Sequence, residues 1–207
     1  ALGLAARSLS DGEARRVRSF LAEELGKSNE LERSAALTLA LGLSGAREAA
    51  RALLDRLADA REPAGTRGAA AQALGLLGDA SPPIVAALER ALKDDAPEVV
   101  QDAALAMGLL GRRDVAAALA ASLRRTDSTA VQGRIILALG YLGNAAAVDP
   151  LLDTLRNEAE KDVAREFAAT ALGILGDRRE RDLLFEIDAW FNYYATSIAT
   201  HELIRLY

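Results

Sequence analysis

The sequence predicts an all-α fold, a right-handed α-solenoid of about six helix pairs stacked in a row. A short motif close to A-L-G-x-L-G recurs five times, with its first glycine at Gly42, Gly75, Gly108, Gly140 and Gly173. Self-similarity at a nearly constant period of about 33 residues is typical of stacked repeats. Each interval holds two amphipathic stretches of helical length. Hydrophobic residues make up 51% of the chain and aromatic ones only 4%, which suits closely packed helices better than strands.

The two glycines of each motif predict the end of a helix. We expect the second glycine to adopt the left-handed conformation that terminates a helix, at Gly45, Gly78, Gly111, Gly143 and Gly176. The first glycine, as in Gly75, lies in the last turn, where the lack of a side chain lets a neighbouring helix approach. A phosphate-binding loop is the alternative. Such a loop opens a helix, however, and no Lys-Ser/Thr pair follows these motifs.

Each repeat is expected to hold an outer helix followed by an inner helix that ends at the glycine pair. In chain order, we expect the pairs at 11–26 and 28–43, 46–60 and 62–77, 81–93 and 96–110, 113–125 and 128–142, and 145–157 and 160–175. Ser10 and Glu13 have the spacing of a capping box. Ser81 and Asp149 each precede a proline, which is typical of a helix start.

The two ends of the chain depart from the repeat, although we expect residues 1–207 to form a single domain. Residues 1–10 contain ALGLA, which we interpret as the remnant of a preceding repeat in a longer protein. Residues 178–207 lack the motif and hold most of the aromatic residues. We expect them to form an atypical capping helix pair that closes the core. An aromatic docking site is the alternative.

The motif A-L-G-x-L-G-D, as in residues 73–79, follows an Ala-rich helix and precedes a Leu-rich one. This pattern resembles the HEAT repeat family, including the HEAT-like repeats of the phycobilisome-lyase type found in bacterial α-solenoids. The resemblance covers five units over residues 11–176. It implies an armadillo-like helical architecture and says little about function, because the family includes scaffolds, adaptors, chromophore lyases and a few enzymes.

The sequence offers little chemistry for catalysis. The absence of Cys excludes disulfides and thiolate metal sites. His201 is the only histidine, and Arg205 stands where a zinc-protease helix needs a second one. We therefore expect no catalytic residue, no metal site and no cofactor, and hence no enzyme. No apolar run reaches the roughly 18 residues of a membrane span, and the sequence does not distinguish a cytoplasmic from a periplasmic location.

Clusters of arginine raise the alternative of nucleic-acid binding. They fall on expected outer helices and turns, for example at Arg112, Arg113, Arg124 and Arg125, and acidic residues lie between them. The net charge of −5 disfavours association with a phosphate backbone. We therefore expect a protein rather than a nucleic acid as the partner.

The inner helices provide the candidate binding surface. Counting from the first glycine of each motif, positions −9, −5, −2 and −1 form the predicted buried stripe. Positions −7, −6 and −3 are then expected to face the concave surface, which is neutral to apolar. The candidate partner-binding residues at these positions are Gln72, Gln101, Leu105, Arg134, Leu137 and Glu166. An exposed apolar strip is typical of a partner surface. Burial of the same residues within a strongly curved stack is the alternative.

These observations lead to a functional hypothesis. The chain is predicted to be a non-catalytic protein–protein interaction scaffold, monomeric as this fragment, whose concave face holds a protein or peptide partner. The resemblance supplies an alternative from another class, a chromophore-lyase-like or chaperone-like subunit. A nucleic-acid-binding HEAT-like protein is the third possibility.

Overall fold

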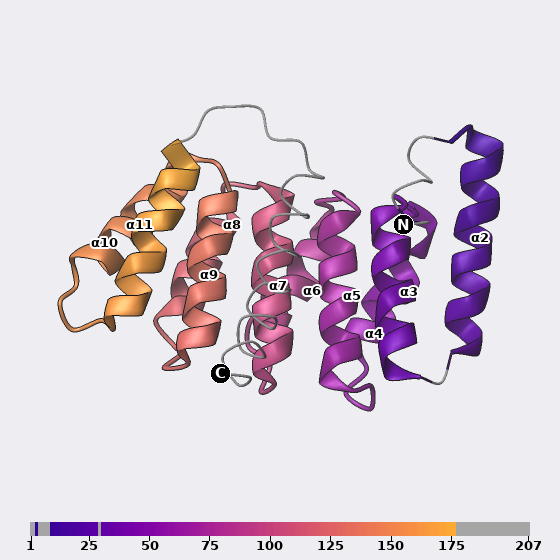
Figure 1. The fold of residues 1–207 in the computed structure, drawn as a ribbon, viewed down its shortest axis with the longest axis horizontal. Helices are drawn as coiled ribbons and strands as arrows, with labels where there is room; N and C mark the ends of the chain where they lie inside the picture. Colours follow the sequence, from indigo (N-terminus) through magenta and orange to yellow (C-terminus); the bar gives the residue numbers. More distant parts are fainter. Residues whose placement is uncertain (1–2, 4–8, 29, 177–207) are drawn as a thin grey trace, which may run out of the picture. The chain divides into compact units, whose positions relative to one another are not determined.

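The computed structural model describes residue 3, residues 9–28 and residues 30–176. The chain divides into two compact units, residues 1–176 and 177–207. The expected remnant at 1–10 therefore falls largely outside the described residues, and the expected capping pair at 178–207 falls wholly outside them. All helices named below belong to the first unit, which Figure 1 shows in colour.

The described part of the chain consists of helices and turns, without strands, in the predicted order (Figure 1). The outer helices are α2 (Asp11–Lys27), α4 (Ala50–Ala58), α6 (Pro82–Ala91), α8 (Val115–Leu123) and α10 (Val148–Arg156). The inner helices are α3 (Leu31–Leu43), α5 (Ala64–Leu76), α7 (Pro97–Leu110), α9 (Thr129–Tyr141) and α11 (Asp162–Gly176). Short 3-10 turns, η1 (Arg47–Ala49) and η2 (Ala145–Ala147), precede α4 and α10. The all-α solenoid expected from the sequence is confirmed.

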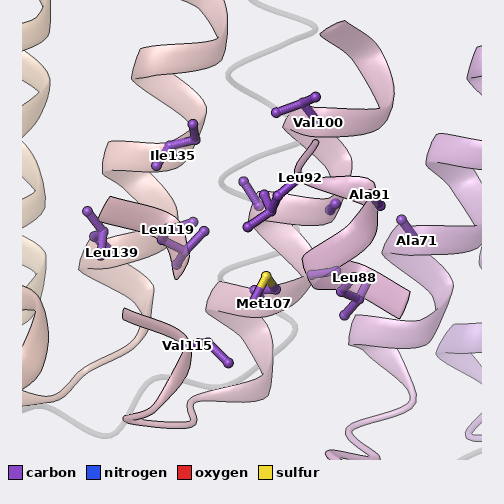
Figure 2. Close-up of a cluster of buried hydrophobic side chains, with 14 of the residues drawn as sticks. Ala71, Leu88, Ala91, Leu92, Val100, Met107, Val115, Leu119, Ile135 and Leu139 are labelled. Carbon is purple, nitrogen blue, oxygen red and sulfur yellow. The ribbon is translucent and has the colours of Figure 1, made fainter. Parts of the chain in front are cut away.

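The inner helices form one continuous row, in which α3 contacts α5, α5 contacts α7, α7 contacts α9 and α9 contacts α11. Each outer helix packs against the inner helix that follows it in the chain. The main core runs without a break from α4 to α11, and Figure 2 shows its central part around Leu88, Met107 and Leu119. A smaller cluster that includes Leu21 and Leu41 joins α2 to α3. Stability therefore rests on interfaces between neighbouring helices.

The predicted buried stripe is present on α7, the central inner helix. Its members Val99, Ala103, Ala106 and Met107 are all inaccessible to solvent. Two of the four are alanines, so the backbones of neighbouring helices lie close together. The larger side chains of the outer helices, such as Leu88 of α6 and Leu119 of α8, supply much of the remaining buried volume (Figure 2).

The second glycine of each motif follows an inner helix in the left-handed region. Its φ angle is 67° at Gly45, 66° at Gly78, 65° at Gly111 and 63° at Gly143. In each pair the N–H of the second glycine donates to the carbonyl oxygen of the first, at 3.1–3.3 Å. This bond uses a carbonyl that would otherwise lack a partner at the helix end. Gly176 is the last residue of α11 and the last described residue.

The first glycine of each of the first four motifs lies against the backbone of the next inner helix. A Cβ atom at Gly75 would lie 2.6 Å from the Cα of Ala106 on α7, and one at Gly42 would lie 2.6 Å from the Cα of Ala73 on α5. At Gly108 the nearest atom would be the carbonyl oxygen of Ala138, at 2.7 Å. These contacts involve backbone atoms, which no side-chain rotation relieves. The glycines therefore set the spacing of the row.

Two of the helix starts show where the sequence predictions succeed and fail. The backbone N–H of Ser10 donates to Glu13 Oε2 at 3.2 Å, and the capping box predicted there is present. The helix expected at 145–157 is present as η2 followed by α10, but Asp149 is not its cap, because α10 already begins at Val148. The capping residue is Asn144, whose Oδ1 accepts a hydrogen bond from the N–H of Ala146 at 3.0 Å. Pro150 then falls in the first turn of α10, where its missing N–H costs no helical hydrogen bond.

Candidate binding surface

The six candidate residues lie on the inner helices but differ widely in exposure. Leu105 and Arg134 are only 7% and 8% exposed. Gln72, Gln101 and Leu137 are half-buried, and Glu166 is exposed. The alternative of burial within the stack therefore holds for Leu105, whereas Leu137 stays half-buried. Leu105 lies on α7, which has another inner helix on each side.

Two of the residues at position −7, which were expected to face the concave surface, are covered by a neighbouring helix. At Gly68 and Gly133, a side chain from position −6 of the next inner helix covers the glycine. A Cβ at Gly68 would collide with the carboxylate of Asp102, and one at Gly133 would lie 2.8 Å from the ring of Phe167. Positions −7 and −6 are thus contact positions between neighbours, at the edges of the exposed surface.

One of these contacts is a polar link between α5 and α7. The Nε2 of Gln72 donates to Asp102 Oδ1 at 2.6 Å. Burial raises the pKa of the Asp102 carboxyl above its usual range. The hydrogen bond from Gln72 and the positive charge of Arg134 act in the opposite direction, and Glu98 adds to the rise. Ionisation of Asp102 in the folded chain therefore lowers the free energy of unfolding.

This cost predicts a pH dependence for the variant Asp102→Asn. Because the pKa of Asp102 is higher in the folded chain than in the unfolded one, the native protein loses stability as the pH rises above the ordinary value of 3.8. The amide of Asn does not ionise, so the variant escapes this loss and still offers Gln72 an acceptor oxygen. Urea unfolding at pH 4 and pH 7 should show the variant gaining stability relative to the native protein at the higher pH.

The control for this measurement is Asp59→Asn. Hydrogen bonds from Arg61 lower the pKa of Asp59 to about 2. Its ionised form therefore stabilises the folded state above the ordinary pKa, and this contribution disappears as the pH falls towards 2. The stability of Asp59→Asn relative to the native protein should therefore fall as the pH rises, which is opposite to the trend expected for Asp102→Asn. A constant difference between Asp102→Asn and the native protein across the pH range would contradict the assignment.

The solvent-facing side of the row is defined by positions −10, −3 and +1, which lie on one side of each inner helix because they are seven and four residues apart. We call this surface the inner face. Position −3 holds Leu39, Gln72, Leu105, Leu137 and Thr170. Position +1 holds Leu43, Leu76, Leu109, Tyr141 and Ile174, and all five of these are half-buried. Together these two positions form an apolar band across the five helices.

Position +1 is the part of the surface that sequence reasoning missed. It is the variable x of A-L-G-x-L-G, which is Leu, Tyr or Ile in every copy. The residue after it, such as Leu77 or Leu142, is buried in the core. A large apolar residue at x would have indicated the band, because x lies four residues after position −3 and therefore on the same side of the helix.

The charges of the inner face are acidic. Position −10 is exposed in every repeat and holds Glu32, Gly65, Glu98, Ala130 and Val163. Glu166, at position −7 of α11, is also exposed. Positions −10, −7, −3 and +1 of the five helices hold no lysine or arginine. Arg134, at position −6, is buried. An apolar band therefore runs beside acidic side chains.

Several arginines outside the inner face pair with acidic neighbours. Arg112 contacts Asp114 at 2.6 Å, and Arg61 contacts Asp59 at 2.7 Å. Arg67 of α5 forms two hydrogen bonds with Asp94, which precedes α7. Of the clustered arginines, Arg112 is paired in this way and Arg125 donates to the backbone carbonyl of Leu92.

The described part of the chain shows neither a metal site nor a membrane-spanning helix. It contains no group of three or more His, Asp or Glu side chains arranged to hold a metal ion. None of its helices combines the length and the apolar character that crossing a bilayer requires. His201, the one histidine, lies outside the described residues.

A solved structure with a similar fold supports the architecture. The complex of CpcE and CpcF of phycocyanin lyase from Nostoc sp. PCC7120 is similar at a TM-score of 0.55 and 24% sequence identity. The match covers 72% of this chain and 61% of that one, so the chain spans less than two thirds of the lyase chain. Human deoxyhypusine hydroxylase in complex with glycerol matches at a TM-score of 0.41 and 21% identity, covering 78% of this chain and 74% of that one. No curated protein matches by sequence.

A family description of HEAT repeats matches the chain in three overlapping segments, residues 18–109, 60–131 and 116–190. These segments include every inner helix, from α3 to α11. The stacked helix pairs, the glycine-terminated inner helices and these matches agree. The chain belongs to the HEAT repeat family.

Proposed function

We propose that this HEAT-repeat chain is a non-catalytic scaffold that binds a segment of a partner protein along its inner face. The apolar band at positions −3 and +1 carries the proposal. A solvent-accessible apolar surface is costly unless a partner covers it. Its position +1 is apolar in every repeat, which makes the band a feature of the whole row rather than of one site.

The dimensions of the band suit a peptide segment. Packed helices lie about 8–10 Å apart, so five inner helices extend the band over roughly 30–40 Å. A helix of about 20–27 residues has this length, at a rise of about 1.5 Å per residue. The apolar residue at position +1 of each helix would then contact the partner at regular intervals.

The test uses the double variant Leu109→Asp with Leu137→Asp. Both side chains are half-buried and lie on adjacent inner helices, so two carboxylates there would disrupt an apolar contact while the core stays intact. Leu105 is unsuitable, since an Asp at a position that is 7% exposed would place a charge in the core. We expect at least tenfold weaker capture of the bound protein from the lysate of the native organism.

The matched control is Ala52→Asp with Ala117→Asp, which adds the same two charges at exposed positions of the outer helices α4 and α8. Circular dichroism should give equal helicity for all three proteins. The partner should be retained by the control and by the native chain. Retention by the double variant as well would exclude the inner face as the binding surface.

The alternative of a chromophore-lyase-like or chaperone-like subunit stays a prediction. It expects the chain to take up a bilin, which absorbance spectroscopy would detect as a shifted and intensified band upon mixing. The scaffold proposal expects an unchanged bilin spectrum.

A further inference from the structure

We propose that the inner face binds a basic amphipathic helix, one whose apolar side is flanked by lysine or arginine. This inference rests on the proposed function and specifies the chemistry of the partner segment. It is carried by charge complementarity and by the distance between the acidic and apolar parts of the inner face.

The two parts of the face run parallel. Position −10 precedes position −3 by seven residues, which is about 10 Å along an inner helix. A helix with its side chains is about 10–12 Å across. A partner helix laid across the row with its apolar side on the band would therefore hold one flank over position −10. The flank over Glu32 and Glu98 would favour positive charge.

Glu32 and Glu98 share position −10 two repeats apart, and Glu166 lies one helical turn further along its own helix. Glu32, Glu98 and Glu166 belong to the first, third and fifth repeats. Residues two repeats apart are separated by roughly 16–20 Å at ordinary helix spacing. On a partner helix this distance corresponds to about 11–13 residues. The lower end of this range is close to three full turns, so cations at that spacing would lie on the same flank.

Helix electrostatics alone do not account for all of these acids. Glu32 and Glu98 lie in the first turns of α3 and α7, where the helix dipole favours negative charge. Glu166, in contrast, lies in the second turn of α11, beyond the first-turn acid Asp162. The described inner face also lacks an accessible cation to neutralise these residues. The acidic side chains therefore remain available to a basic partner.

The experiment measures the affinity of the full chain for two synthetic helical peptides by fluorescence anisotropy. Both peptides carry one leucine stripe. The basic peptide has lysines on one flank, spaced by three helical turns or about 11 residues. The acidic peptide has glutamates at the same positions. We expect the basic peptide to bind at least tenfold more tightly at low salt, and the preference to shrink in about 0.5 M salt because screening weakens it.

The double variant Glu32→Lys with Glu98→Lys should reduce the preference to less than twofold or reverse it. The control pair, Glu89→Lys with Asp153→Lys, makes the same change in net charge on exposed positions of outer helices α6 and α10. It should leave a preference of at least fivefold. An equal loss of preference in the control would overturn the inference, because net charge alone would then explain the binding.

The variant Leu109→Asp with Leu137→Asp separates this inference from the proposed function. If the native chain binds both peptides equally and the variant binds neither, the basic partner is refuted and the inner face remains a binding surface. If either peptide binds this variant as tightly as it binds the native chain, both proposals are refuted.

Discussion

Replacing Gly75 with Ala should lower the free energy of unfolding by about 2 kcal/mol. The new methyl group would lie 2.6 Å from the Cα of Ala106 on the next inner helix. Overpacking of this kind costs about 1–3 kcal/mol, and a backbone contact belongs at the upper end because no rotamer change relieves it. The higher helix propensity of Ala offsets at most about 1 kcal/mol. Urea unfolding followed by circular dichroism measures the difference.

The matched control is Gly65→Ala on the same helix, α5. A Cβ at Gly65 would have no neighbour within 4 Å. The substitution therefore adds only helix propensity and should stabilise the protein by up to about 1 kcal/mol. Opposite signs for the two substitutions would show that Gly75 sets the spacing between α5 and α7. If Gly75→Ala left the free energy of unfolding unchanged, the inner helices would be free to move apart.

Replacing Leu119 with Ala should lower the free energy of unfolding by about 2–5 kcal/mol. Leu119 is inaccessible to solvent and lies in the continuous core near Met107 and Leu139 (Figure 2). The outer helix α8 is short and otherwise rich in alanine, so Val115 and Leu119 are its two large, fully buried anchors. Truncation leaves a cavity that the surrounding alanines cannot fill.

The same substitution at Leu123, the last residue of α8, provides the comparison. Leu123 is half-buried, so its truncation opens a smaller void that water can enter. We expect a loss well below that of Leu119→Ala, about 1 kcal/mol. Guanidinium unfolding of the three proteins, with the slopes compared, would reveal any change in cooperativity as well. Equal losses at the two positions would show that α8 is not anchored by its buried face.

The spacing of the motif was sufficient to predict the repeat and the order of its helices. The reason is local, since a glycine pair such as Gly75 and Gly78 ends a helix through its own backbone conformation. Helix starts were predicted less accurately. The cap at Ser10 followed from adjacent residues, whereas Asp149 was misassigned because Asn144 begins a 3-10 turn before α10. Asn144 and Asp149 are both residue types that cap helices, and the structure uses Asn144.

The candidate surface was predicted only in part, because it depends on contacts between repeats. Helical periodicity placed Leu105 and Leu137 on the same position of successive helices. The structure nevertheless buries the first and leaves the second half-exposed. The role of Gly68 as a contact point for Asp102 depends on how closely the helices approach. That distance is a property of the stack, which no single repeat encodes.

Hydrogen exchange of the full chain, with and without the basic peptide, tests the central claim most directly. If the inner face is the binding surface, the peptide should slow exchange in the inner helices α5, α7 and α9. The outer helices α4, α6 and α8 should be unchanged. Protection confined to the outer helices, or no protection at a peptide concentration that saturates binding, would contradict the account.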